Sequence, residues 1–128
     1  MKLLLDTHAL LWFLAGEEKL SGVARTLIED EGNEVLVSAG SLWEIAIKVS
    51  LGKLGMSVPF EDAFPSLLDA NEIRILQISP GHLRKVVALP FHHRDPFDRL
   101  LAAQAIADEL SIVSRDPAFD AYGVRRLW

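Results

Sequence analysis

Cysteine is absent from this chain of 128 residues. Disulfide bonds, thiolate metal sites and thiol nucleophiles are therefore excluded, and a bound metal ion would need oxygen or imidazole ligands. The sequence also lacks a glycine-rich phosphate loop and a serine in a nucleophile elbow. It has no internal repeat, low-complexity tract or break in composition, so we predict one domain over residues 1–128. The lack of cysteine is compatible with a reducing compartment, and we expect a cytoplasmic location.

Long apolar runs are missing as well, and this limits association with membranes. The first residues, MKLLLDTHALLWFLAG, have the charged and then apolar order of a signal peptide, but Asp6 and His8 interrupt the apolar part. Only Ala9 to Ala15 remain unbroken, which is shorter than the roughly 20 residues of a membrane-spanning helix. We therefore expect neither an export signal nor a transmembrane span.

Positive charge is scarce overall, since the net charge at pH 7 is -5. This balance argues against a protein whose main task is to coat nucleic acid. Residues 1–72 carry 5 basic and 12 acidic side chains, whereas residues 73–128 carry 8 and 6. Arginines beside an acidic centre can contact phosphate groups, and a solvated charged surface is an equally good interpretation of each of them.

Short apolar segments alternate with helical patterns along the whole chain. The predicted strands are Lys2–Leu5, Glu34–Val37, Glu72–Leu76, Ser111–Ser114 and Val124–Leu127. The predicted helices are Thr7–Ala15, Ser21–Glu31, Ser38–Gly52, Phe60–Ala70 with a bend at Pro65, and Ser79–Leu89. After a polar loop through Arg94 comes a further helix, with Pro96 in its first turn, that runs to Leu110, and then a short turn or helix over Pro117–Tyr122. This alternation predicts an α/β fold, a three-layer α/β/α sandwich with a mostly parallel sheet of four to five strands.

Four acidic residues lie where an apolar segment meets a turn or in the first turns of a helix: Asp6, Glu44, Asp98 and Asp116. Asp6 and Asp116 each follow a predicted strand, and Asp98 is one turn into a helix with a smooth face formed by Leu100, Leu101, Gln104, Ala105 and Ala107. Ligands collect outside the carboxyl ends of parallel strands, so acids from distant parts of the chain can meet there. The pattern predicts one metal site.

Two of these acids also have an ordinary structural interpretation. Asp6, with Thr7 beside it, is an expected helix N-cap after a strand. Glu44 and Lys48 have the i, i+4 spacing of a surface ion pair. Asp120 competes with Asp116, but Asp116 has the better strand-end position.

Two adjacent histidines, His92 and His93, precede the Asp98 helix. We favour a plain polar loop over metal ligation, because neighbouring loop histidines rarely converge on one ion. The aromatic residues Trp12 and Phe13 have helical spacings typical of a core or a subunit interface.

The acids belong to four longer stretches that together resemble a known family. These are LLLDTHALLW (Leu3–Trp12), SAGSLWEIAIK (Ser38–Lys48), HRDPFDRLLAAQA (His93–Ala105) and IVSRDPAFDAYGV (Ile112–Val124). The chain is similar to PIN domains, and specifically to the VapC-type toxins of bacterial and archaeal toxin–antitoxin pairs. The resemblance runs from the first predicted strand to the last, and no acid of the family's pattern is missing.

The resemblance implies a metal-dependent endoribonuclease that leaves 5′-phosphate and 3′-hydroxyl ends. Its catalytic and metal-binding residues would be Asp6, Glu44, Asp98 and Asp116, with Mg²⁺ or Mn²⁺ as the ion. Supporting positions would be Thr7 and Ser114, which are small hydroxyl residues, and Asp95, as a further ligand or hydrogen-bond acceptor. Candidates for contacts with RNA are Lys48, Arg94, Arg99 and Arg115.

The resemblance also implies protein partners. VapC-like proteins usually form homodimers, and a cognate antitoxin silences them with a C-terminal segment that blocks the acidic pocket. We expect Trp12 and Phe13 in or near the surface that such an antitoxin covers.

Three other functions are compatible with a small α/β domain, and each requires features that differ from those of an endoribonuclease. A Mg²⁺-binding receiver module would need paired acids after the first strand, where Thr7 and His8 stand, and a lysine after a late strand, where Arg115 stands. A haloacid-dehalogenase-like phosphatase would need an aspartate in place of His8. A PIN fold retained only for binding RNA or protein would differ in failing to cleave RNA.

Overall fold

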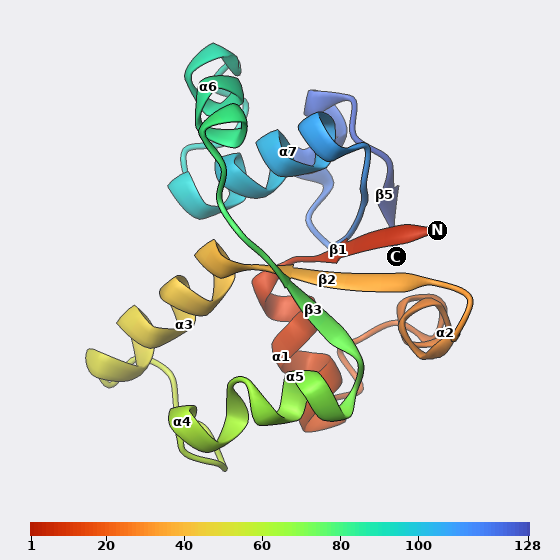
Figure 1. Ribbon diagram of the computed structural model, residues 1–128, viewed down its shortest axis with the longest axis vertical. Coiled ribbons are helices and arrows are strands. Elements are labelled where there is room, and N and C mark those ends of the chain that lie inside the picture. The colour runs from red at the N-terminus through yellow and green to blue at the C-terminus, as the bar shows by residue number, and fades with distance from the viewer.

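The computed structural model describes all residues 1–128 and consists of a central sheet between two layers of helices (Figure 1). The strands are β1 (Lys2–Leu5), β2 (Glu34–Ser38), β3 (Ile73–Leu76), β4 (Ser111–Val113) and β5 (Arg126–Leu127). They form one sheet in the order β3-β2-β1-β4-β5, and every neighbouring pair is parallel. The predicted α/β/α sandwich with a parallel sheet is therefore confirmed.

The central strand β1 is buried on both faces. Leu3, Leu4 and Leu5 each have 0% exposure. Leu3 and Leu5 belong to one apolar core, and Leu4 belongs to the other on the opposite face. A strand in this position needs a continuous apolar run rather than alternation with polar residues, which is why three consecutive leucines suit it.

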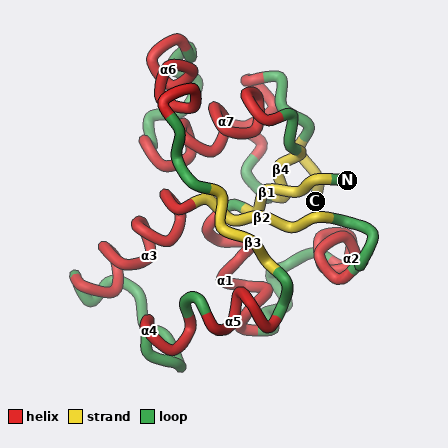
Figure 2. Tube along the Cα trace, in the orientation of Figure 1, coloured by secondary structure: helices red, strands yellow, loops and turns green.

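Helices cover the two faces in two groups. One face carries α1 (Thr7–Ala15), α2 (Gly22–Glu29), α3 (Ala39–Ser50), α4 (Phe60–Ala63) and α5 (Ser66–Ala70). The other carries α6 (Pro80–Ala88), α7 (Pro96–Asp108) and the 3-10 helix η1 (Pro117–Tyr122). Figure 2 shows the strands as the layer between them. No helix has both the length and the apolar character needed to cross a membrane.

Some predicted helices are shorter than their sequence patterns suggested. The helix predicted over Ser21–Glu31 is α2, for which Ser21 is the N-cap and accepts a hydrogen bond from the Ala24 N–H at 3.0 Å. The single helix predicted over Phe60–Ala70 is two short helices, α4 and α5. Proline at position 65 has no N–H to donate and clashes with a preceding helical turn, so the expected bend is a break.

Helices α3 and α7 approach closely where α3 begins. A Cβ atom at Gly40 would lie 2.5 Å from Leu100 Cδ2, so a larger residue would require the Leu100 side chain to shift. All residues of α7 from Arg99 to Ala105 are buried, so every side of this part of the helix is covered. Ala107 is exposed, contrary to its predicted place on the packed face. This contact matters because α3 carries Glu44 and α7 carries Asp98.

Candidate metal centre

Asp6 lies directly after β1 and begins α1. Its Oδ1 accepts a hydrogen bond from the Ala9 N–H at 2.8 Å, and the residue is only 7% exposed. The capping interpretation is correct. Ser114 is a further side-chain hydrogen-bond partner of Asp6.

Glu44 projects from the second turn of α3 and is buried. The Thr7 hydroxyl donates to Oε1 at 2.6 Å, and Lys48 Nζ donates to Oε2 at 3.0 Å. The expected ion pair is present, but it does not make Glu44 a surface residue, since the exposure of Glu44 is 7%. Thr7 therefore links the start of α1 to this acid.

Asp95 and Asp98 lie together at the start of α7. Asp95 is the N-cap, and its Oδ1 accepts hydrogen bonds from the N–H groups of Phe97 at 2.8 Å and Asp98 at 3.2 Å. Asp98 is in the first turn. The helix thus begins with two carboxylates, of which the first fixes the backbone that carries the second.

Asp116 follows β4 and begins η1. Its Oδ1 accepts from the Ala118 N–H at 2.9 Å, and its own N–H donates to the Ser114 hydroxyl at 3.0 Å. Asp120 is instead paired with Arg126, at 3.0 Å between Oδ1 and Nε. The preference for Asp116 over Asp120 as the strand-end acid agrees with these contacts.

His93 is the residue that sequence reasoning missed. Its Nε2 lies 3.1 Å from Oδ2 of Asp98 and 3.1 Å from Oδ2 of Asp116. These three atoms all lie within 4.8 Å of one another. His93 therefore faces two acids from within the loop, whereas His92 is exposed and its ring packs edge-on against Tyr122. The available signal was the position of His93, two residues before the N-cap of the Asp98 helix.

Negative charge is concentrated around Asp98. Burial raises the pKa of Asp98 to about 7. The negative charge of Asp95 acts in the same direction, as do the charges of Asp6 and Glu44, while His93 opposes them. Repulsion from Asp6 and Glu44 means that acids from β1, α3 and α7 share one electrostatic environment.

The pKa values of the two strand-end acids, Asp6 and Asp116, shift in opposite directions. Burial raises the pKa of Asp6, against the effect of hydrogen bonds with Ser114 and the Ala9 N–H. Partial burial also acts to raise the pKa of Asp116, but hydrogen bonds from the Ala118 N–H and His93 outweigh it and hold that pKa below its ordinary value. Asp6 and Asp98 thus resist ionisation, whereas Asp116 ionises readily.

Arg99 does not face the site, and its prediction as an RNA contact is wrong. The residue is 6% exposed, and its guanidinium donates to the backbone carbonyls of Pro90 at 2.9 Å and Val86 at 3.0 Å. The Phe91 ring lies against it, with 4.0 Å between Cζ and the ring centroid. Arg99 therefore holds the end of α6 and the following turn onto α7.

Arg115 is an exposed basic residue beside two of the acids. Arg94 and Arg115 are exposed, and the Arg115 guanidinium lies over the Trp12 ring at 4.9 Å from its centroid. A cavity of about 350 Å³ opens here, and its lining is formed by Asp6, His8, Trp12, Arg115, Asp116 and Pro117. Two of the acids therefore face a space that also has an aromatic ring and a fixed positive charge.

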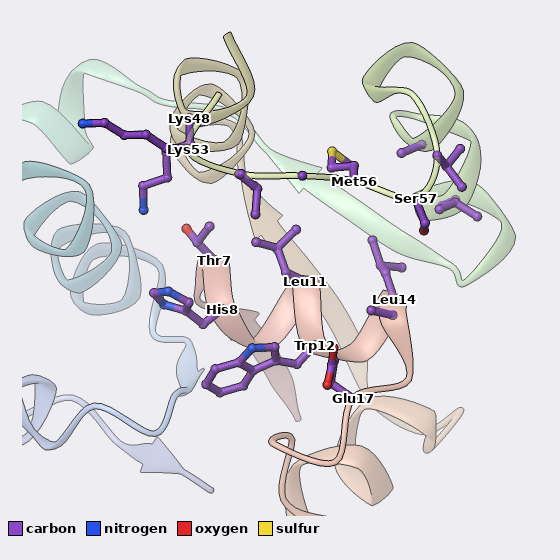
Figure 3. Close-up of a pocket in the computed structure, with 16 residues that line it drawn as sticks. Thr7, His8, Leu11, Trp12, Leu14, Glu17, Lys48, Lys53, Met56 and Ser57 are labelled. Atoms are coloured by element: carbon purple, nitrogen blue, oxygen red, sulfur yellow. The ribbon is translucent and has the colours of Figure 1, made fainter. Parts of the chain in front are cut away.

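A larger and more apolar groove of about 480 Å³ lies on the far side of Trp12. In Figure 3, Leu11 and Leu14 point from α1 toward the segment that carries Met56, and Lys53 lies at one end. Phe13 does not line this groove and instead packs beneath Arg25, whose Cζ is 6.0 Å from its ring centroid. Trp12 thus separates the acidic cavity from the apolar groove.

The parallel sheet and the acids at its carboxyl edge define an α/β protein with an oxygen-rich site of the kind that hard divalent cations prefer. The family model for the PIN domain matches residues 3–124. Ribonuclease VapC22 of Mycobacterium tuberculosis is 32% identical over 114 residues, which is 88% of this chain and 85% of that protein. The chain belongs to the PIN domain family.

Solved structures share the fold at lower sequence identity. VapBC2 from Rickettsia felis, in a crystal structure with a DNA fragment from its promoter, has a TM-score of 0.71 at 16% identity, covering 99% of this chain and 98% of that chain. FitAcB from Neisseria gonorrhoeae has a TM-score of 0.68 at 20% identity, covering 98% of this chain and 96% of that chain. These likenesses extend over the entire sheet and both helical layers.

Proposed function

We propose that this protein is a metal-dependent endoribonuclease and the toxin of a type II toxin–antitoxin pair. The observation that supports the proposal is the electrostatic coupling of acids from separate segments: the charges of Asp6 and Glu44 act to raise the pKa of Asp98, and His93 Nε2 lies 3.1 Å from both Asp98 and Asp116. A relative that matches 88% of the chain is a ribonuclease, which supports RNA as the substrate.

The donor set fits Mg²⁺ or Mn²⁺. All four acids offer carboxylate oxygens, and the raised pKa of Asp98, about 7, reflects burial and repulsion that a bound cation would relieve. Asp6, Asp98 and Glu44 would hold the ion, and Asp116 would hold a second ion or position a water molecule. When bound, the metal would polarise the scissile phosphate and lower the pKa of an attacking water.

The remaining polar residues orient these acids. Thr7 directs Oε1 of Glu44, and Asp95 fixes the first turn of α7 by accepting hydrogen bonds from its N–H groups. The Ser114 hydroxyl accepts from the backbone of Asp116. Such support matters because an acid that is displaced by an ångström loses much of its effect on a positioned phosphate.

Exposed cations beside the acids suit the negatively charged backbone of RNA. Arg115 lines the cavity that contains Asp6 and Asp116, and Arg94 is exposed two residues after His92. Lys48 is paired with Glu44 and also lines the apolar groove. We assign Arg115, Arg94 and Lys48 as phosphate contacts, and the Trp12 ring as a surface on which a base can stack.

The apolar groove is the proposed position of the antitoxin. Its lining from α1 and residues 54–58 is largely apolar, and it adjoins the acidic cavity at Trp12, so one segment could fill the groove and cover the acids. Trp12→Ala should weaken the antitoxin complex, whereas Val87→Ser, an exposed position on α6, should not.

We further propose a homodimer in the cytoplasm.

The direct test is incubation of purified protein with total cellular RNA and Mg²⁺, followed by mapping of new 5′ ends. Cleavage should require the metal, stop with EDTA and be absent from Asp98→Asn. Expression of the wild type alone should arrest growth, and co-expression of the antitoxin should restore it. If the well-folded wild type bound RNA without cutting it under these conditions, the protein would be a binding module rather than a nuclease.

A further inference from the structure

The ring of His93 is held from both sides. The Asp95 N–H donates to Nδ1 at 3.1 Å, and the His93 backbone N–H donates to the Tyr122 hydroxyl at 2.9 Å. On its other edge the ring presents Nε2 to Asp98 and Asp116. These bonds fix both the loop and the plane of the imidazole.

These contacts determine which ring nitrogen carries a proton. A backbone N–H can only donate, so Nδ1 of His93 is an acceptor and has no proton in this arrangement. The proton of the ring is therefore on Nε2, which makes the hydrogen bond to Asp116 at 3.1 Å. A nitrogen that carries a proton has no lone pair for a metal ion. The geometry thus distinguishes a hydrogen-bond donor from a ligand.

The two carboxylates that meet at His93 come from different segments. Asp98 is on α7, and Asp116 follows β4. One oxygen of each carboxylate lies within 4.8 Å of the other, so the two negative charges repel. An N–H group between them offsets part of that repulsion. Without His93, the side chain of Asp116 would keep only the bond from the Ala118 N–H, which holds its other oxygen.

We propose that His93 is a positioning residue of the acidic site: its Nε2–H group donates to Asp116 and lies 3.1 Å from Asp98, which keeps the two carboxylates close enough to share one divalent ion without His93 itself binding the ion. The inference rests on the proposed metal-dependent function. Partners that orient metal ligands typically affect metal affinity by roughly 10–100-fold, and His93 acts here on two ligands at once.

Two substitutions of His93 distinguish the role of Nε2 from that of Nδ1. The amide of glutamine reaches about as far as Nε2, so His93→Gln retains a donor toward Asp98 and Asp116. The amide of asparagine reaches about as far as Nδ1, so His93→Asn retains an acceptor for the Asp95 N–H and loses the donor. His92→Gln and His92→Asn, in the same loop, serve as matched controls.

The measurement is calorimetric titration of the metal-free full-length variants with Mn²⁺, above the Asp98 pKa of about 7. We expect His93→Asn to weaken binding by roughly 10–100-fold, and His93→Gln and the His92 variants to stay within a few-fold of wild type. Equal loss in both His93 variants would indicate that His93 is a ligand and would overturn the proposal. Unchanged binding in His93→Asn would overturn it by showing that the donor is dispensable.

Nitrogen NMR of the imidazole gives a readout that does not depend on substitution. In the wild type with saturating Mg²⁺, we expect Nε2 of His93 to keep its proton, whereas ligation would remove it. Absence of Mn²⁺ binding by the wild type would contradict the proposed function itself. Binding and RNA cleavage by the wild type together with a failed variant pattern would contradict only the role of His93.

Discussion

Two histidines of this protein make nearly the same hydrogen bonds in two different places. His82 accepts the Ser79 N–H at Nδ1, at 3.1 Å, and its Nε2 lies 3.0 Å from Asp108 Oδ2. His93 accepts the Asp95 N–H at Nδ1, also at 3.1 Å, and its Nε2 lies 3.1 Å from a carboxylate oxygen of each of two aspartates. Each ring thus carries its proton on Nε2 and turns it toward negative charge.

The difference lies in what surrounds each pair. His82 has a side-chain exposure of 5% and meets one carboxylate, at the last residue of α7. It completes a capping box at the start of α6 and joins α6 to α7, which is a purely structural task. His93 meets two carboxylates, and further acids raise the pKa of one of them. The same hydrogen bonds around a histidine therefore serve the proposed metal site only at His93, where distant segments bring additional acids.

The strongest test of this comparison uses the two ends of α7. Asp98→Asn should lower RNA cleavage by more than about 100-fold, because loss of a ligand exceeds the effect typical of an outer partner. Asp6→Asn should do the same. Asp108 is the partly exposed partner of His82 and lies outside the acidic site. Asp108→Asn should therefore leave cleavage unchanged and lower the free energy of unfolding by about 1 kcal/mol. Wild-type cleavage by purified Asp98→Asn would remove this residue from the site.

Glu44 and its neighbour Lys48 separate the loss of a proposed metal ligand from the loss of its ion-pair partner. Glu44→Gln should behave like Asp98→Asn, because both remove a proposed ligand, whereas Lys48→Ala should reduce cleavage less, because it removes one phosphate contact and an i, i+4 ion pair that contributes a few tenths of a kcal/mol. Rates measured at equal protein concentration, with circular dichroism to check folding, decide between them. An equally large loss in Lys48→Ala would favour a joint structural role for the pair.

Much of this arrangement could be predicted from the sequence because it depends on local patterns. The leucines of β1 are a continuous apolar run, and Asp6 and Asp116 follow strands whose carboxyl ends meet at one edge of a parallel sheet. Both acids are helix caps through a single carboxylate oxygen, so capping does not exclude the proposed role in metal binding.

His93 and Arg99 could not be assigned correctly because their roles depend on contacts between distant segments. Nothing in the pair His92-His93 shows which ring turns inward; Asp116 and Tyr122, later in the chain, hold His93. The charge of Arg99 suggested a surface position, but the turn after α6 surrounds it with carbonyl groups. Spacing along one helix carries no information about such partners.

The acids of the site should also make the metal-free protein sensitive to pH. Asp98 has a folded pKa of about 7 against an ordinary value of 3.8, so the folded state binds its proton more tightly. Stability from this group is fully present below 3.8 and is lost as the pH rises toward about 7. Asp6 acts in the same direction. Asp116, with a lowered pKa, acts only at lower pH, where its contribution is lost as the pH falls.

Urea denaturation with EDTA across this range measures the effect. The free energy of unfolding should decrease from weakly acidic to neutral pH in the wild type, and Asp98→Asn should lose most of that decrease. A wild-type stability that does not fall over this interval would show that the carboxylate is not destabilised in the folded protein.

The most direct test of the shared metal site is a thermal melt of the wild type with EDTA, Mg²⁺ or Mn²⁺ at a pH above the Asp98 pKa of about 7. An ion that binds only the folded state, at about 100 times its dissociation constant, adds roughly 2.7 kcal/mol to the free energy of unfolding. We predict a clear rise in Tm for the wild type and for Asp108→Asn, and little or none for Asp98→Asn. An unchanged wild-type Tm with millimolar levels of either ion, or an equal rise in Asp98→Asn, would contradict the shared site.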